Sequence, residues 1–194
     1  MRDATLVVLA GGRGERMGTP KALLRVGDVT LVEWIVARLA PSFGEVLVCG
    51  ATDAPSPARA LADDRPDAGP LGGIETGLAA ASHDAVFVLA CDTPRASAGL
   101  AGLLVERSAG HDAAVPRIAG RTQPTCAAYR KRALAGIGAF LDAGGRRATR
   151  ALETMDVAYV ETADLERRGI DPRELGDLDT SEDYDAFIAS LAAR

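Results

Sequence analysis

Short apolar runs alternate along this chain with longer stretches in which apolar residues recur at helical spacing. The runs have the length of buried strands and end at glycines or polar turns, and they cover residues 6–9, 46–49, 86–91, 113–115 and 157–160. The amphipathic stretches predict helices, which run from Thr30 to Pro41, from the loop at 63–73 past residue 81, and over residues 97–107, 131–142, 146–154 and 181–192. This alternation indicates an α/β protein with a mostly parallel sheet and helices on both faces.

Local signals refine the pattern where periodicity is weak. Thr30 and Glu33 have the spacing of a capping box, which fixes the start of the first helix. The Pro- and Ala-rich stretch 51–62 is predicted to hold a short strand near Leu61, and a further segment without an assigned type covers residues 124–129. The second half of the chain therefore continues the α/β alternation less clearly than the first half.

Composition and charge narrow the class of protein and partner. No linker or charge run divides the chain, so we expect a single domain over residues 1–194. A net charge of −5 disfavours a nucleic-acid or anionic membrane partner. The sequence has neither a signal-peptide pattern nor an apolar stretch of membrane-spanning length, so we expect a cytoplasmic protein. Cys49, Cys91 and Cys126 each lie in or beside an apolar run and are predicted to be buried thiols.

A glycine-rich turn follows the first apolar run, at residues 10–14. Glycines let backbone N–H groups converge on an anion without a Cβ in the way, and Arg13, Arg16 and Lys21 supply cations nearby. Because the chain has 20 Arg but only two Lys, Lys21 is of particular interest. The P-loop motif is excluded because Lys21 is followed by Ala22, and the glycine spacing excludes the dinucleotide-binding fingerprint. The turn is therefore predicted to bind phosphates without either motif.

Further candidates lie where other predicted strands end, since ligands of open parallel sheets bind at the carboxyl ends of strands. The loop 63–73 is one candidate, and Asp92 is another because a carboxylate there suits Mg²⁺. The alternative is that Asp92 only begins an Asx-turn toward Pro94. Asp177 and Asp179 would share one face of an extended segment, or Asp179 or Thr180 would cap the last helix.

Six sequence pieces together resemble the molybdenum cofactor guanylyltransferases, and the match covers nearly the whole chain. The pieces, in order, are 9–12 (LAGG), 16–18 (RMG) with Lys21, 69–73 (GPLGG), 91–94 (CDTP), 123–124 (QP) and 179–180 (DT). The resemblance implies a Rossmann-like three-layer α/β sandwich that transfers GMP from MgGTP to molybdopterin-bound molybdenum and releases pyrophosphate. It also implies GTP and the molybdopterin cofactor as substrates, Mg²⁺ as cofactor, and molybdoenzyme chaperones as partners.

The resemblance also assigns residues to roles. It assigns catalysis to Arg16, Lys21 and Asp92, and Mg²⁺ binding to Asp92 and Asp179. An acidic residue before the GPL piece helps to bind the nucleotide in this family, and both Asp63 and Asp64 fit that position. The predicted nucleotide-binding residues are Leu9, Ala10, Gly11, Gly12, Lys21, Asp63, Asp64, Gly69, Pro70, Leu71 and Asp92.

Three positions depart from the family pattern. Cys49 stands where relatives carry a nucleotide-contacting Asn, Arg95 replaces an apolar or aromatic residue, and Asp179 lies where an Asn is usual. The competing interpretations are a sister enzyme that uses CTP for the same cofactor, or that activates a phospholactate-like or sugar phosphate, and a non-catalytic nucleotide-binding protein. The LAGG and GPLGG pieces favour guanine over cytosine.

Overall fold

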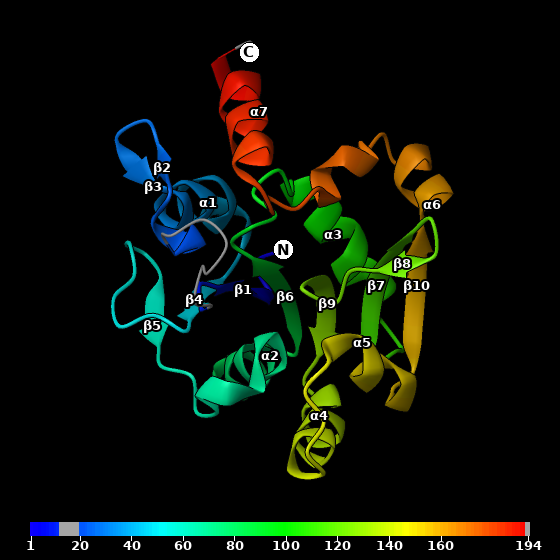
Figure 1. Ribbon diagram of the computed structural model, residues 1–194. Helices are drawn as coiled ribbons and strands as arrows, with labels where there is room; N and C mark the ends of the chain where they lie inside the picture. The colour runs from blue at the N-terminus through cyan, green and yellow to red at the C-terminus, as the bar shows by residue number, and fades with distance from the viewer. Residues whose placement is uncertain (12–19, 193–194) are drawn as a thin grey trace.

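A mixed eight-stranded sheet forms the centre of the computed structural model, which describes residues 1–11 and 20–192 (Figure 1). Seven strands follow one another in the order β10-β7-β9-β6-β1-β4-β5, and β8 pairs with β7. The strands of this sheet are β1 (Ala4–Leu9), β4 (Glu45–Cys49), β5 (Arg59–Leu61), β6 (Ala85–Ala90), β7 (Ala113–Ile118), β8 (Arg121–Thr122), β9 (Cys126–Arg130) and β10 (Val157–Glu161). A separate hairpin joins β2 (Arg25–Val26) to β3 (Val29–Thr30).

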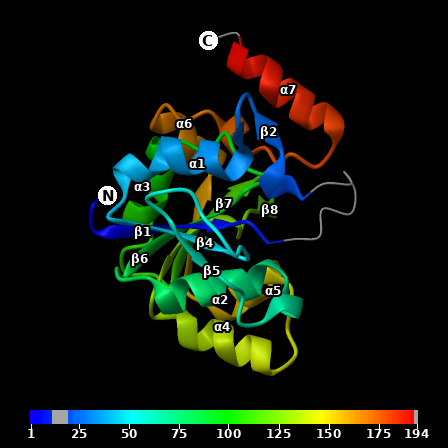
Figure 2. The ribbon, with the colours of Figure 1, turned by 90° about the vertical axis from the view of Figure 1, so that its left-hand side faces the viewer.

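Helices cover both faces of the sheet. Figures 1 and 2 show α2, α4 and α5 below it and α1, α3 and α6 above it, with α7 extending from the upper layer. The helices are α1 (Leu31–Leu39), α2 (Pro70–Ala80), α3 (Ala98–Arg107), α4 (Ala133–Asp142), α5 (Ala148–Ala151), α6 (Thr162–Arg167) and α7 (Ser181–Ala192), with 3₁₀ turns η1 (Lys21–Leu23), η2 (Ala40–Ser42), η3 (Pro66–Ala68), η4 (Leu152–Thr154) and η5 (Pro172–Leu175). In the described part of the chain, no helix is both long and apolar enough to cross a membrane.

The central strand β1 shows why the sheet needs a helical layer on each side. Leu6 and Val8 pack into the apolar cluster under α1 and α3, whereas Val7 and Leu9 pack into the cluster over α2. Successive side chains of a strand point to opposite faces, and all four of these residues are buried. An apolar run without alternation is therefore the sequence of a strand covered on both faces, as in parallel sheets. The predicted three-layer α/β fold is confirmed.

One long strand reverses the direction of the sheet. β9 is antiparallel to both of its neighbours, β6 and β7, whereas β5, β4, β1 and β6 run parallel to one another, as do β7 and β10. The beginning of β9 therefore lies at the edge of the sheet where β1, β4 and β6 end. Residues 123–125, which precede β9, come to the same edge as the loops after the parallel strands.

The predicted elements are found with small shifts at their ends. The capping box at Thr30 and Glu33 is present, the helix that follows ends at Leu39, and the short strand near Leu61 is β5. The predicted helix 146–154 is divided into α5 and η4. The three cysteines are free and buried, as predicted. The β2–β3 hairpin, β8 and α6 were not predicted, because strands of two residues and a helix of less than two turns are too short to show their period.

Candidate active site

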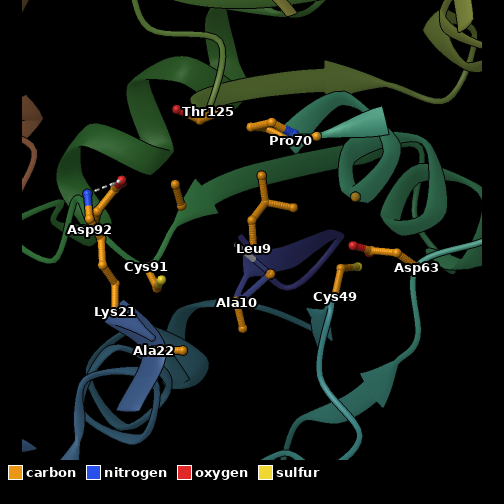
Figure 3. Close-up of a pocket in the computed structure, with 14 residues that line it drawn as sticks. Leu9, Ala10, Lys21, Ala22, Cys49, Asp63, Pro70, Cys91, Asp92 and Thr125 are labelled. Carbon is orange, nitrogen blue, oxygen red and sulfur yellow. Dashed lines mark hydrogen bonds and ion pairs between the residues drawn. The ribbon is translucent and has the colours of Figure 1, made fainter. Parts of the chain in front are cut away.

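A cavity of about 400 Å³ opens at the carboxyl edge of the sheet, where β1, β4 and β6 end. Its walls come from these strand ends, from η1, from the beginning of α2 and from the residue before β9 (Figure 3). The described residues that line it are Leu9, Ala10, Gly11, Lys21, Ala22, Cys49, Asp63, Gly69, Pro70, Gly73, Ala90, Cys91, Asp92 and Thr125.

Lys21 holds two carboxylates at one end of this cavity. Its Nζ lies 3.1 Å from Asp92 Oδ2 and 3.0 Å from Asp179 Oδ1. Burial alone would lower the pKa of Lys21, but the hydrogen bonds and charges of Asp179 and Asp92 raise it above its usual value. The lysine therefore stays positively charged, and it links the first part of the chain to the last part.

The Asp92 backbone is fixed by the C-terminal segment. Leu178 N–H donates to the Asp92 carbonyl at 2.7 Å, and the Thr93 hydroxyl donates to Asp177 Oδ1 at 2.9 Å. Burial raises the pKa of Asp177, and the charge of Asp92 adds to this shift. The Asx-turn alternative fails, because the residue that would donate to the Asp92 side chain is Pro94, which has no N–H.

Residues 177–180 serve both of the roles that the sequence left open, which are to present carboxylates to the site and to cap the last helix. Asp177 and Asp179 both lie at the Asp92 end of the site. Asp177 accepts a hydrogen bond from the Thr93 hydroxyl, and Asp179 forms an ion pair with Lys21. The helix α7 is capped by Thr180, whose Oγ1 accepts from Asp183 N–H while Asp183 Oδ2 accepts from Thr180 N–H. Capping therefore falls to Thr180, which leaves Asp179 available to the site.

Asp63 lies across the cavity from Lys21, beside Cys49 (Figure 3). Its Oδ1 is buried and has no hydrogen-bond partner among the described residues. Burial, together with the nearby charge of Asp64, raises the pKa of Asp63. Asp64 is exposed and does not line the cavity, and its backbone N–H donates to Thr76 Oγ1. Of the two acidic candidates, Asp63 is therefore the one placed to meet a ligand.

Next to Asp63, the backbones of Gly11 and Gly50 lie in close contact, and Gly11 forms part of the cavity wall. Gly50 has φ +80°, and a Cβ at this position would lie 2.6 Å from Gly11 Cα. Only glycine accommodates both the left-handed conformation and the close approach. The loops after β1 and β4 therefore touch through their backbones, which leaves the space above them open.

Asp92 and Asp179 are the acidic side chains at this end of the cavity that could hold a divalent cation. Among the described residues, no three His, Cys, Asp or Glu side chains are grouped to hold a metal by themselves. Mg²⁺ commonly takes one or two carboxylates and completes its coordination with phosphate oxygens and water. Asp92, with Asp179 on the same lysine, offers such a set.

Comparison with known proteins decides the family. The sequence matches the family described as MobA-like NTP transferase domain over residues 6–157. The chain belongs to this family. A probable molybdenum cofactor guanylyltransferase of Methanosarcina acetivorans is 33% identical over 214 residues, covering 100% of this chain and 93% of the relative. The molybdenum cofactor guanylyltransferase of Syntrophotalea carbinolica is 30% identical over 192 residues, covering 96% and 91%.

Solved structures agree with this fold. The crystal structure of molybdopterin-guanine dinucleotide biosynthesis protein A from Archaeoglobus fulgidus superposes with a TM-score of 0.85 at 22% identity, covering 98% of this chain and 100% of that one. The 2-C-methyl-D-erythritol 4-phosphate cytidylyltransferase of Thermus thermophilus gives 0.70 at 22% identity, covering 97% and 98%. Enzymes named for different bases share this fold, so specificity has to be argued from the site.

Most residues predicted to bind the nucleotide of this MobA-like domain come together in the cavity. Those that line it are Leu9, Ala10, Gly11, Lys21, Asp63, Gly69, Pro70 and Asp92. Leu71 is instead buried in the core, and Asp64 is exposed and does not line the cavity. Gly12 and Arg16 lie outside the described residues. Sequence reasoning missed Thr125, although the QP piece immediately before it was a signal for this position.

The unpartnered Asp63 oxygen leads to a prediction about stability. Because its pKa is raised in the folded protein, Asp63 favours folding below its unfolded pKa of about 4 and loses this contribution as the pH rises through the folded pKa. Asp63→Asn should therefore raise the Tm at pH 7 by about 2–4 °C, or on the order of 1 kcal/mol. Calorimetric scans at pH 7 and pH 4 test this, and the gain should shrink at the lower pH. Asp67→Asn, an exposed change in the same loop, should leave the Tm unchanged; an equal gain there would contradict the explanation.

Proposed function

We propose that this protein transfers GMP from MgGTP to the molybdopterin-bound molybdenum cofactor and releases pyrophosphate. The observation that carries the proposal is a single cavity with an unpartnered carboxylate, Asp63, at one end and the Lys21–Asp92 pair at the other. A nucleotide has matching chemistry, with hydrogen-bond donors on the base and negative charge on the phosphates. Relatives over the full chain are named guanylyltransferases, which supports guanine as the base.

Asp63 is proposed to select the base. Guanine presents N1–H and an exocyclic amine side by side, and a carboxylate accepts from both. The buried Asp63 Oδ1 lacks a partner among the described residues, so binding guanine would supply the donor that it needs. Cytosine and adenine lack this pair of adjacent donors. A buried polar group left unpaired costs about 1–3 kcal/mol, so two mismatches give discrimination on the order of 10².

At the other end, the residues are proposed to serve the transfer itself. Asp92 and Asp179 would hold Mg²⁺, which supplies charge neutralisation to the phosphates when it is bound. Lys21 moves its ammonium from the two carboxylates to the phosphates, where it stabilises negative charge. A terminal phosphate oxygen of the acceptor forms a bond to the α-phosphorus as the bond to the β-phosphate oxygen breaks. Transfer of this kind requires positioning and neutralisation more than covalent help from the protein.

We place this reaction in the cytoplasm, and propose molybdoenzymes or their chaperones as recipients of the product.

Nucleotide binding is the first test of the proposed function. Calorimetric titration of the protein with MgGTP, MgCTP and MgATP should give a dissociation constant for MgGTP about 10²-fold lower than for the others. Tighter binding of MgCTP would instead support a cytidylyltransferase. Binding of MgGTP with no pyrophosphate release in the presence of the acceptor would support a non-catalytic protein.

The role of Asp63 has its own comparison. Asp63→Ala should remove most of the preference for GTP, because the two guanine donors lose their acceptor. Asp64→Ala is the matched control, since it removes the neighbouring exposed carboxylate and should leave the preference intact. Unchanged selectivity in Asp63→Ala would show that this carboxylate does not read the base.

A further inference from the structure

Thr125 contributes a hydroxyl to the cavity from the position immediately before β9, the strand that runs antiparallel to both of its neighbours. Because β9 is antiparallel to β6, the residue that precedes it lies at the edge where β6 ends at Ala90. The Thr125 carbonyl accepts from Ala90 N–H at 2.7 Å, which fixes its backbone two residues from Asp92. In Figure 3 Thr125 lies across the cavity from Ala10 and Ala22, and its hydroxyl is turned to the side on which Lys21 and Asp92 lie.

Among the described residues, hydrogen-bond donors are scarce at this end of the cavity. Three N–H groups at the strand ends already have acceptors. Ala10 N–H donates to the Cys49 carbonyl, Ala90 N–H to the Thr125 carbonyl and Cys91 N–H to the Leu9 carbonyl. Among the described lining residues, Lys21 and Thr125 provide the strong side-chain donors. The Lys21 ammonium is shared between two carboxylates, whereas the Thr125 hydroxyl has no hydrogen-bond partner among the described residues.

The order of the strands places Thr125 on a particular side of the reacting phosphorus. Across the sheet, Asp63 follows β5, Asp92 follows β6 and Thr125 precedes β9. With the base at Asp63 and the phosphates at Asp92, as in the proposed function on which this inference rests, the acceptor has to approach from the side of β9. Thr125 then lies beside the transferred group, on the side from which the acceptor comes.

We propose that Thr125 is a catalytic residue whose hydroxyl donates a hydrogen bond to the α-phosphoryl group during transfer. In the step, a phosphate oxygen of the acceptor forms a bond to the α-phosphorus. The bond from this phosphorus to the β-phosphate oxygen breaks, and pyrophosphate leaves with that electron pair. Negative charge on the equatorial oxygens is where a preorganised donor has its largest effect. The Thr125 proton stays on its oxygen, so no base is needed.

The test compares Thr125→Val, which removes the hydroxyl at nearly constant shape, with Thr125→Ser, which restores it. For Thr125→Val we expect kcat to fall by about 10- to 100-fold, with the calorimetric dissociation constant of MgGTP and the Tm close to those of the wild type. Thr125→Ser should recover most of the activity. Thr122→Val in β8 makes the same substitution outside the cavity and should leave kcat unchanged.

Four outcomes would overturn the inference. The first is a kcat within twofold of wild type for Thr125→Val, and the second is weaker MgGTP binding with normal kcat, which would place the hydroxyl on the ground-state nucleotide. The third is an equal loss in Thr125→Val and Thr125→Ser with a lowered Tm, which would make the role structural. In all three cases the wild type still turns over MgGTP and acceptor, so the proposed function stands. The fourth outcome, a wild type that releases no pyrophosphate, removes both proposals.

Discussion

Asp92→Asn should lower the pyrophosphate-release rate with MgGTP and acceptor by about 10³-fold or more, while the protein stays folded. The substitution keeps the shape of the side chain but removes the charge that would hold the cation. A bound cation stabilises the transition state by several kcal/mol, and this stabilisation would be lost. The backbone bond from Leu178 N–H to the Asp92 carbonyl remains. The Lys21–Asp92 pair is partly exposed, so its loss should cost less than about 1 kcal/mol of stability.

Asp112→Asn is the matched control for this experiment. Asp112 is as exposed as Asp92, at 27% against 28%, and its carboxylate also pairs with a cation, Arg132. It lies at the opposite end of the sheet, immediately before β7. Turnover should be unchanged in Asp112→Asn. Near-normal Mg²⁺-dependent turnover in Asp92→Asn would remove this residue from the metal site.

Lys21→Ala should reduce kcat/KM for MgGTP by about 10²- to 10³-fold. A charge-assisted contact to phosphate is lost, and it is worth about 1.5–3 kcal/mol in binding before any gain in the transition state. The Tm should change little, because an ion pair near the surface contributes weakly to stability. Lys131→Ala changes the only other lysine in the sequence and should behave as wild type. Normal kcat/KM in Lys21→Ala would exclude the phosphate contact.

The same substitution should act in the opposite direction on free metal. Without nucleotide, the Lys21 ammonium neutralises Asp92 and Asp179, so it competes with a divalent cation for them. Removing the ammonium should tighten Mn²⁺ binding by about 30-fold, because unit charges at 4 Å in water interact by about 1 kcal/mol and the double charge of Mn²⁺ makes this about 2 kcal/mol. Electron paramagnetic resonance titration of Mn²⁺ measures this directly. Weaker Mn²⁺ binding in Lys21→Ala would show that the two carboxylates are not a cation site.

The spacing of apolar residues predicted the layers of the fold well. It did not predict the direction of strand β9. β1 and β6 are so uniformly apolar that only a sheet covered on both faces accommodates them. Residues 126–130 carry the same kind of pattern, yet β9 runs in reverse. Side-chain alternation is identical in both directions of a strand, so orientation depends on the connections that precede and follow it. This ambiguity is why Thr125 was not assigned to the cavity.

The site could be predicted where each loop acts alone, and not where distant segments meet. Lys21 and Asp92 were recognisable because each follows a strand. Choosing Asp63 over Asp64 required knowing which side chain the loop turns toward the cavity, and this depends on how the loop packs against α2, where Asp64 N–H donates to Thr76 Oγ1. The partnership of Lys21 with Asp179 joins residues 158 positions apart, which no local pattern contains.

That separation also has a consequence for how the protein is made. At roughly 5–20 residues per second, the ribosome adds Asp179 about 8 to 32 seconds after Lys21, since the two residues are 158 positions apart. Until then the strands of the first half have no C-terminal segment to hold the Asp92 turn through Leu178. A nascent chain can therefore build the Asp63 end of the cavity well before the Asp92 end. A messenger truncated before residue 177 would encode a protein without Asp179 as the partner of Lys21, without the Leu178 contact to the Asp92 turn, and without the buried Leu178 and Phe187 side chains.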